Sequence, residues 1–419
     1  MKFIHAADIH LDSPLIGLEQ YDGAPVEDIR GATRQALQNL VELAIVEHVA
    51  FLLVAGDLYD GDWKDYNTGL FFAAQMTKLR EAGIRVFLIA GNHDAASQIT
   101  RPLRMPDNVK WLSVQKPESI VMECCGVAIH GQGFSSRSVA EDISAAYPES
   151  IPGLFNIGLL HTSANGREGH ESYAPCSLQG LLSKDYDYWA LGHVHKREIL
   201  HQNPWVLFPG NIQGRHVRET GPKGCTLVTV QDETVLVEHR DIDVLRWAVC
   251  DVDASDAVTG EEVLDRVAGV LKRELSGADN RPLAVRLRIT GSCGAHGALS
   301  ANTDRWTNEI RAIATDLSNG EIWIENIRLQ TQNAVDIEGM ARTDSPLGGL
   351  LRMIGDLDAD EQVLASMIGE FADIQRKLPA ELRTGEDAID LDNPETLRGA
   401  LEDVKQLLVA RILSGDDGR

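Results

Sequence analysis

The chain has 419 residues, six cysteines and a formal net charge of −24. This length exceeds what one hydrophobic core usually organises, so we expect a large domain and at least one smaller domain. The cysteines show neither disulfide-framework density nor C-x-x-C spacing, and no apolar stretch reaches bilayer length. These features exclude a disulfide scaffold and a transmembrane protein and predict a cytoplasmic location. The acidic charge argues against a broad nucleic-acid-binding surface.

Residues 1–245 alternate short apolar runs with helix-like segments. We expect strands at Phe3–Ala7, Phe51–Ala55 and Val86–Ala90, and helices at Gly31–Val46 and Thr68–Glu81. This order predicts an α/β fold, either an α/β/α core or a layered sandwich, with polar clusters at the carboxyl ends of the strands. Further strands are expected at Val127–His130, Ile157–His161, Tyr188–Leu191, Trp205–Phe208 and Thr226–Val230.

Residues 246–338 repeat the alternation on a smaller scale and predict a compact α/β domain. Its expected strands and helices are Arg246–Val252, Glu261–Leu275, Leu283–Thr290, Thr303–Leu317 and Ile322–Leu329. Residues 345–419 form a helical tail, with apolar residues at helical spacing between 363 and 374. A last helix is expected to begin at Asn393 and Pro394, because asparagine caps helices well and proline is tolerated in their first turn.

Five separated motifs carry metal-binding residue types, and each follows an apolar run. Their side chains are carboxylates, an amide and imidazoles without a thiolate, which suits manganese, iron or zinc in sites with several oxygen ligands. Any one motif alone would more often be a surface or core feature. The motifs are Asp8-Ile9-His10, Gly56-Asp57-Leu58-Tyr59-Asp60, Gly91-Asn92-His93-Asp94, His161 and Gly192-His193-Val194-His195.

The spacing within the motifs indicates how the ligands could be arranged. Asp8 and His10 alternate, so both side chains would point to one side of an extended strand end and could hold one ion; His193 and His195 alternate likewise. Asp57 leaves a buried strand and is the natural bridge between two ions. Such a pair of ions acidifies water and clamps the attacking and leaving oxygens of a phosphate ester. Glycines 56, 91 and 192 suit turns with unusual backbone angles.

At these motifs the chain resembles the calcineurin-like metallophosphoesterase superfamily. Within it, the sequence is most similar to DNA-repair exonucleases of the SbcD type, and in particular to their YhaO-like branch. The resemblance extends over the second domain, which would be the α/β capping domain of those nucleases, and fades over the tail. It implies a metallophosphoesterase layered sandwich core that holds two divalent metal ions.

The resemblance also implies a role for each motif residue. Asp57 would bind both ions, and Asn92 with His161 and His193 would hold the second. His93 would be the catalytic acid, and Asp94 would orient it. Asp60 matches the last position of the second motif, where some of these nucleases carry histidine, so its role stays open. The first ion would be held by Asp8, His10 and His195.

Two other features have alternative interpretations. His5 lies inside the first strand and is expected to be a structural histidine. The loop at 209–218 follows a strand and carries Arg215, His216 and Arg218, which could contact substrate phosphate or form a solvated turn.

The favoured function is a manganese-dependent DNA exonuclease or endonuclease in DNA repair that uses a metal-bound hydroxide as nucleophile. The alternative is a phosphodiesterase or phosphatase of nucleotides or other small phosphate esters; a scaffold without metals is the third hypothesis. The expected partners are DNA, a second copy of the chain, and an SMC-like ATPase that the tail would bind. Leu397, Leu401, Val404 and Leu408 form a narrow apolar stripe that would pack against such a partner or against this chain.

Overall fold

The computed structural model describes residues 1–13, 26–60, 66–96, 104–164, 174–232, 234–334, 337–359 and 393–413, and seven single residues between 366 and 391. The chain divides into two compact units. Unit 1 comprises Met1–Val249, Leu275–Val285 and Glu321–Glu325, and unit 2 comprises Cys250–Glu274, Arg286–Gly320 and Asn326–Arg419. Among the described residues, no helix has the length and apolar character needed to cross a membrane.

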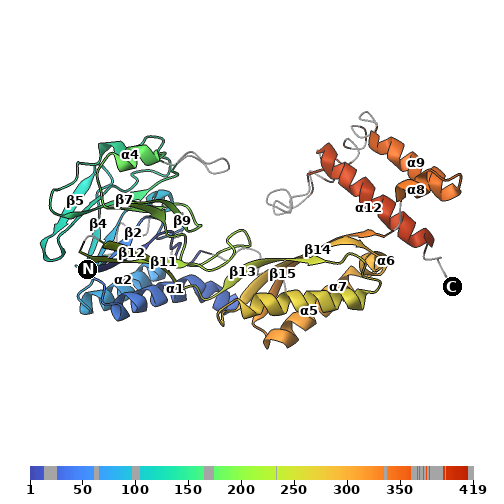
Figure 1. Cartoon of the computed structure of the whole chain (residues 1–419), viewed down its shortest axis with the longest axis horizontal. Coiled ribbons are helices and arrows are strands. Elements are labelled where there is room, and N and C mark those ends of the chain that lie inside the picture. Colours follow the sequence, from blue (N-terminus) through green and yellow to red (C-terminus); the bar gives the residue numbers. More distant parts are fainter. Residues whose placement is uncertain are drawn as a thin grey trace. The chain divides into compact units, whose positions relative to one another are not determined.

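Unit 1 contains two six-stranded sheets (Figure 1). The first has the order β12-β11-β1-β2-β3-β4 and the second the order β5-β6-β7-β8-β10-β9. The strands of the first sheet are β1 (Lys2–Ala6), β2 (Phe51–Val54), β3 (Arg85–Leu88), β4 (Val109–Trp111), β11 (Gly224–Gln231) and β12 (Thr234–Asp241). Those of the second are β5 (Glu118–Met122), β6 (Val127–Gly131), β7 (Phe155–His161), β8 (Tyr188–Gly192), β9 (Glu198–Gln202) and β10 (Trp205–Phe208).

The central strands of each sheet run parallel, and antiparallel strands lie toward the edges. In the first sheet β1 to β4 are parallel, whereas β11 pairs antiparallel with β1 and with β12. In the second, β6, β7, β8 and β10 are parallel, and β5 and β9 are antiparallel. The carboxyl ends of β1, β2 and β3 coincide, because Ala6 lies opposite Val54 and Val54 lies opposite Leu88.

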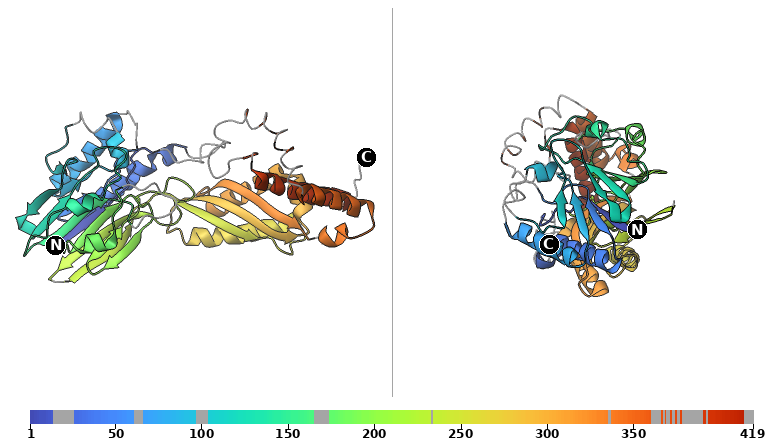
Figure 2. Two further views of the ribbon diagram at one scale, coloured as in Figure 1. Left: turned by 90° about the horizontal axis from the view of Figure 1, so that it is seen from above. Right: turned by 90° about the vertical axis from the view of Figure 1, so that its left-hand side faces the viewer.

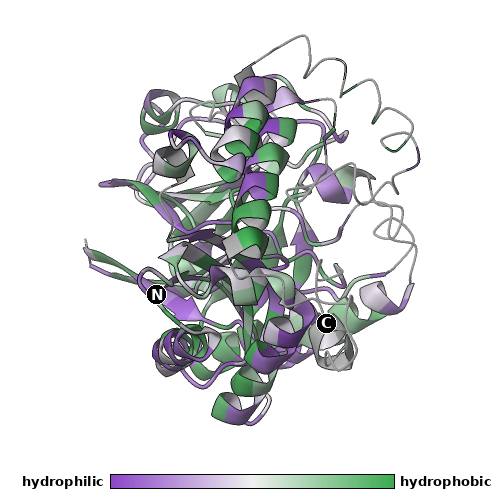
Figure 3. Cartoon of the chain, turned by 90° about the vertical axis from the view of Figure 1, so that its right-hand side faces the viewer, coloured by the Kyte–Doolittle hydropathy of each residue, from purple (hydrophilic) through white to green (hydrophobic). Residues whose placement is uncertain are grey.

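One hydrophobic core lies between the two sheets and another lies between the first sheet and its helices, so the predicted sandwich is confirmed rather than a single sheet with helices on both faces. Alternate residues of a strand point to opposite faces. Phe3 of β1 therefore packs between the sheets, and Ile4 packs toward the helices. The helices of the first sheet are α1 (Val26–Val46) and α2 (Tyr66–Glu81), and a short α4 (Leu178–Leu182) packs with the outer face of the second sheet. In Figure 3 the helices carry both hydrophobic and hydrophilic residues, as this layered packing requires.

A third sheet has three strands in the order β13-β14-β15. They are β13 (Arg246–Asp253), β14 (Leu283–Cys293) and β15 (Ile322–Asn333), and they alternate with α5 (Gly260–Ser276), α6 (His296–Ala301) and α7 (Thr303–Ser318). The elements expected over 246–329 are therefore present. Each of the three strands begins in unit 1 and ends in unit 2. The domain boundaries at 245, 338 and 345 stay predictions.

The described part of the tail is helical, with α8 (Ile337–Ala341), α9 (Pro346–Ala359) and α12 (Pro394–Leu413) (Figure 2). The predicted start of the last helix is confirmed, because the Asn393 Oδ1 accepts the Glu395 N–H at 3.0 Å. Leu397 and Leu401 are buried in a cluster with Ile354 of α9. Most of the predicted stripe thus packs on the chain's own helices. Most residues between 360 and 389, including 363, 364 and 367, lie outside the described residues.

Candidate metal centre

The motif residues lie where parallel strands end. Asp8, Asp57 and Asn92 follow β1, β2 and β3 of the first sheet. In the second sheet, His161 ends β7 and lies opposite Gly192 at the end of β8. Since the carboxyl ends of parallel strands meet at one edge of a sheet, the loops that carry these side chains come together there.

The backbone at this edge is unusual for residues other than glycine. Asp8, His10, Asp57 and His193 have φ angles of 50°, 43°, 52° and 104°. Such left-handed conformations cost free energy and cluster at functional sites. The extended backbone that the sequence suggested for Asp8 and His10 is therefore wrong: β1 ends at Ala6 and a left-handed turn aims these side chains.

Asp8, His10 and His195 form one potential ligand group. Each offers a ligand atom within 4.8 Å of the others. The Nε2 atoms of His10 and His195 are 3.2 Å apart, and both carboxylate oxygens of Asp8 accept the His193 backbone N–H at 3.0 and 3.1 Å. Asp8 and His10 are completely buried. These three potential ligand atoms, two of them on buried side chains, lie close together as the ligands of a cation do.

Asp57, His161 and His193 form a second group with the same 4.8 Å limit. The His161 Nε2 lies 3.4 Å from the Asp57 Oδ2 and 3.0 Å from the Asn92 Oδ1. Its Nδ1 faces the Ala55 carbonyl at 2.9 Å and can donate to it. This contact directs Nε2 toward the group. His193 and His195 therefore fall into different groups, and the expectation from their alternation that they share one ion is wrong.

Asp57 connects the two groups. Its Oδ1 accepts the His93 backbone N–H at 2.9 Å, which fixes the carboxylate. Its Oδ2 lies 3.4 Å from the His161 Nε2 and 3.9 Å from the His10 Nε2. One oxygen therefore faces an imidazole of each group, which is the placement that a bridging carboxylate needs.

Two glycines keep the strand ends close together. Gly56 has a φ of 91°, and a Cβ there would lie 2.4 Å from the His161 Nδ1. A Cβ on Gly192 would lie 1.8 Å from the Ala55 carbonyl oxygen. Any side chain at either position would push β7 and β8 away from the loop that carries Asp57.

Burial controls the charges of the candidate ligands. It lowers the pKa of His10 to about 3, so this imidazole is neutral at pH 7 and its lone pair can bind a metal. Burial raises the pKa of Asp8 to about 6. At His161 burial is opposed and outweighed by the Asp57 carboxylate, which raises the pKa to about 9. The buried Asp57 charge thus favours positive charge beside it, which a divalent cation provides.

His93 and Asp60 form a third potential group with His10 under the same 4.8 Å limit, and they pair with each other. The His93 Nδ1 is 2.9 Å from the Asp60 Oδ1, and this hydrogen bond is the largest effect that raises the pKa of His93. The Asp60 Oδ2 accepts the Ser13 hydroxyl at 2.7 Å, so the carboxylate is held on both sides. The residue that orients His93 in the structure is therefore Asp60.

The family resemblance implied that Asp94 orients His93, but Asp94 makes other contacts. Its carboxylate accepts the backbone N–H groups of Leu58, Tyr59 and Gly91 at 2.9 to 3.1 Å. It thus ties the Asp57 loop to the Asn92 loop. The assignment of Asp94 as the partner of His93 is corrected, because the His93 Nδ1 pairs with Asp60 and Asp94 accepts these three backbone N–H groups.

Residues of the loop between β10 and β11 also contact the candidate metal centre. The Arg215 guanidinium is only 13% exposed, and it lies 3.8 Å from the Asp60 Oδ2 and 3.4 Å from the Ser13 Oγ. His216 is half-buried and Arg218 is exposed. The solvated-turn interpretation is therefore wrong for Arg215. The sequence analysis missed Glu219, a buried carboxylate of this loop that contacts His195 at 2.6 Å.

Comparisons with known proteins agree with this arrangement. Residues 1–197 match the calcineurin-like phosphoesterases, and residues 247–332 match the middle domain of metallophosphoesterase YhaO. The chain is 33% identical over 367 residues to the uncharacterized metallophosphoesterase YhaO of Bacillus subtilis, which covers 86% of this chain and 88% of that protein. The chain belongs to the YhaO-like metallophosphoesterases.

More distant relatives of this metallophosphoesterase are named as DNA repair proteins. The DNA double-strand break repair protein Mre11 of Sulfurisphaera tokodaii is 24% identical, covering 61% of this chain and 66% of that protein. The protein of the same name from Methanopyrus kandleri is also 24% identical, covering 82% of this chain and 76% of that protein. Membership of the family makes the chain a hydrolase of phosphoesters that depends on divalent metal ions.

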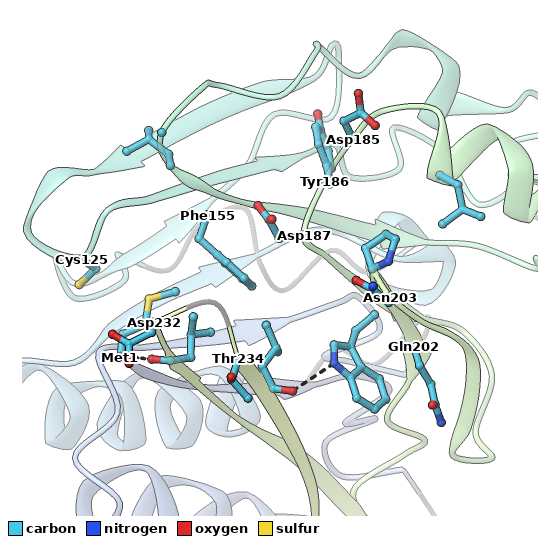
Figure 4. A pocket seen from close by; sticks show the side chains of 17 residues that line it. Met1, Cys125, Phe155, Asp185, Tyr186, Asp187, Gln202, Asn203, Asp232 and Thr234 are labelled. Atoms are coloured by element: carbon cyan, nitrogen blue, oxygen red, sulfur yellow. Dashed lines mark hydrogen bonds between the residues drawn. The ribbon is translucent and has the colours of Figure 1, made fainter.

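A separate hollow of about 1070 Å³ lies at the other ends of the strands (Figure 4). Its wall includes Met1, Phe155 and Asp187, which precede or begin β1, β7 and β8. The metal-ligand candidates of this metallophosphoesterase follow the carboxyl ends of the strands. The hollow is therefore not part of the candidate metal centre.

His5 is a structural histidine, as expected. Its ring is buried between the sheets, with Nδ1 3.0 Å from the Tyr188 hydroxyl and Nε2 3.0 Å from the Leu191 carbonyl oxygen. Both ring nitrogens are thus used within the fold of the metallophosphoesterase.

Proposed function

We propose that this metallophosphoesterase is a two-metal phosphodiesterase that cleaves DNA. The observation that carries the proposal is the Asp57 carboxylate, whose Oδ2 faces His10 of one ligand group and His161 of the other. The relatives named as DNA double-strand break repair proteins support DNA as the substrate and repair as the role. Carboxylate and imidazole ligands without a thiolate suit manganese, iron or zinc, and we take manganese as the metal to test first.

Seven residues of the chain would hold the two metal ions that hydrolysis needs. When bound, a pair of divalent cations acidifies water and offsets the charge of a phosphodiester. Asp8, His10 and His195 would hold one cation, and Asn92, His161 and His193 the other, with Asp57 shared. These are the ligands that the family resemblance implies, and the two described groups support them.

His93 would act as the catalytic acid. Its Nδ1 donates to Asp60, so the opposite nitrogen, Nε2, would carry the proton that the leaving oxygen needs. Arg215 would place its guanidinium beside a phosphate oxygen next to the His195 group. Because Arg215 is near the candidate ligands, its positive charge would attract the anionic phosphate of the substrate although the whole chain is acidic.

A substrate panel tests the proposed function. Purified protein would be incubated with manganese, magnesium or chelator, and with labelled single-stranded, duplex and hairpin DNA, a cyclic nucleotide and an aryl phosphodiester. We expect manganese to support cleavage of at least one DNA substrate and chelator to abolish it. Hydrolysis of the cyclic nucleotide with all DNA left intact would instead establish the small-molecule phosphodiesterase.

We further propose that the tail binds an SMC-like ATPase through the residues that its own packing leaves exposed. Val404 of α12 is 44% exposed, whereas Leu397 and Leu401 are buried in the chain. Replacing Val404 with Glu should weaken ATPase binding in a titration and leave thermal unfolding unchanged. If the variant binds the ATPase with unchanged affinity, the proposal that α12 is the docking helix is rejected.

A further inference from the structure

Glu219 contacts both the candidate metal ligand His195 and the loop at 209–218, which carries Arg215. It follows β10 in the chain and is only 6% exposed. Its Oε1 lies 2.6 Å from the His195 Nδ1, and its Oε2 accepts the Arg215 backbone N–H at 2.7 Å and the Asn211 side-chain amide at 2.9 Å. Oε2 therefore accepts two hydrogen bonds of defined direction, and a charged Oε1 would accept a third from the His195 Nδ1 in the tautomer that carries a proton there.

The same loop also fixes the backbone of His195. The His195 carbonyl accepts the Lys223 ammonium at 3.0 Å and the Asn211 N–H at 3.3 Å. His195 is thus held at its ring and at its main chain by residues from one segment. Because Nδ1 faces the Glu219 carboxylate, Nε2 is the ring nitrogen directed toward His10.

The two ligand groups differ in the acceptor behind their imidazoles. His195 faces the carboxylate of Glu219, whereas His161 faces the neutral carbonyl of Ala55. A carboxylate behind a ligating imidazole fixes its tautomer and raises its basicity. His195 therefore gains a basicity that the Ala55 carbonyl does not give to His161.

Arg215 depends on the same carboxylate. Its backbone N–H donates to the Glu219 Oε2, and its guanidinium lies 3.6 Å from Oε1. These two contacts direct the guanidinium toward Ser13 and Asp60 at the metal-site edge. Without them fewer contacts would hold the guanidinium at this edge.

We propose that Glu219 is a positioning residue that acts in two ways. It raises the metal affinity of the group formed by Asp8, His10 and His195, and it holds Arg215 where a phosphate oxygen of the substrate binds. The second role rests on the proposed phosphodiesterase function, whereas the first concerns only metal binding.

Glu219→Gln tests the metal-binding role. The amide NH₂ of glutamine cannot accept, so at least one of the donors at Arg215, Asn211 and His195 loses its acceptor. Loss of such an outer contact typically costs about 10–100-fold in metal affinity. Manganese titrated into metal-free protein, followed by calorimetry and by the electron paramagnetic resonance of free manganese, should show one of two binding steps weakened and the other retained.

Glu118→Gln is the matched control. Glu118 also accepts a backbone N–H, from Ser113 at 2.9 Å, and pairs with Lys110 at 2.6 Å, and these described contacts do not include a candidate ligand. Both binding steps should be unchanged in this variant. Glu219→Asp, which keeps the charge but has a shorter side chain, should give an affinity between wild type and Glu219→Gln.

Kinetics separate the second role from the first. At saturating manganese, Arg215→Ala should raise KM for the phosphodiester at least about tenfold without weakening either metal-binding step, because it removes a positive charge beside His195. Glu219→Gln should raise KM and also weaken one metal-binding step. Wild-type metal affinities in both Glu219 variants, or equal weakening of both steps, would overturn the proposal. Two intact binding steps without phosphodiester cleavage by the wild type would reject the proposed function and leave the metal-binding role standing.

Discussion

Asp57→Ala is expected to remove both metal ions and with them nearly all activity. Its Oδ2 is 3.4 Å from the His161 Nε2 and 3.9 Å from the His10 Nε2, so one oxygen serves both ligand groups. A variant of any other candidate ligand would damage chiefly one group. Elemental analysis after desalting should show the metal content per chain fall from about two to well below one, with phosphodiester hydrolysis reduced by more than about 10³-fold.

Two further variants complete the metal-content experiment, one as a second test of Asp57 and one as a control. Asp57→Asn keeps the shape of the side chain and its oxygen toward the His93 N–H, yet lacks the negative charge, so it should also lose metal. Asp107→Ala is the control, because this aspartate is exposed and only 3.9 Å from Arg80 at the surface. Full metal content in both Asp57 variants would exclude the bridging role.

His93→Ala is expected to lower the rate by about 10²–10⁴-fold while both ions stay bound, because a general acid contributes about that much without a metal bond. Asp60→Asn should give a smaller loss, since it removes only the partner that orients His93 at 2.9 Å. The double variant should be no slower than His93→Ala alone, because residues that act as a unit are not additive.

The leaving group offers a check that does not depend on metal analysis. An aryl phosphodiester with an acidic phenol as leaving group needs little protonation, so His93→Ala should lose much less rate on it than on DNA. An equal loss on both substrates would reject the acid role. Loss of metal from His93→Ala would show that this histidine is a ligand.

The elements with strong apolar patterns could be predicted from the sequence. The three strands that begin at Lys2, Phe51 and Arg85 lie within two residues of their expected positions, because they are short buried runs between clear helices. Edge strands such as β9 and β12 were missed. Their residues are only partly buried, so the apolar signal is weak.

The composition of the candidate metal centre could also be predicted, but its internal contacts could not. The motif residues stand out because they follow apolar strands. Neither Asp60 nor Asp94 reveals its hydrogen-bond partner in the sequence, since both follow the ends of neighbouring strands. Glu219 has no signal at all: it lies 24 residues beyond its partner His195, in an irregular loop.

Periodicity likewise could not decide what covers the tail. An apolar stripe must be buried, but its spacing is the same for a partner helix and for a helix of the same chain. Only the three-dimensional arrangement shows Leu397 and Leu401 packed with Ile354. Val404 remains exposed from the same stripe.

β13, β14 and β15 each begin in unit 1 and end in unit 2, and this affects how the protein would respond to limited proteolysis. Many multidomain proteins are joined by one exposed peptide, and a single proteolytic nick releases their fragments. Here the chain passes between the units five times, and three of these passages lie within β13, β14 and β15, so a nick in one of these strands leaves the other connections intact. Scission after residue 245 would also detach the Trp247 indole, which donates to the Gly214 carbonyl beside Arg215. A fragment that ends there would therefore lose a hydrogen bond that supports the loop carrying Arg215.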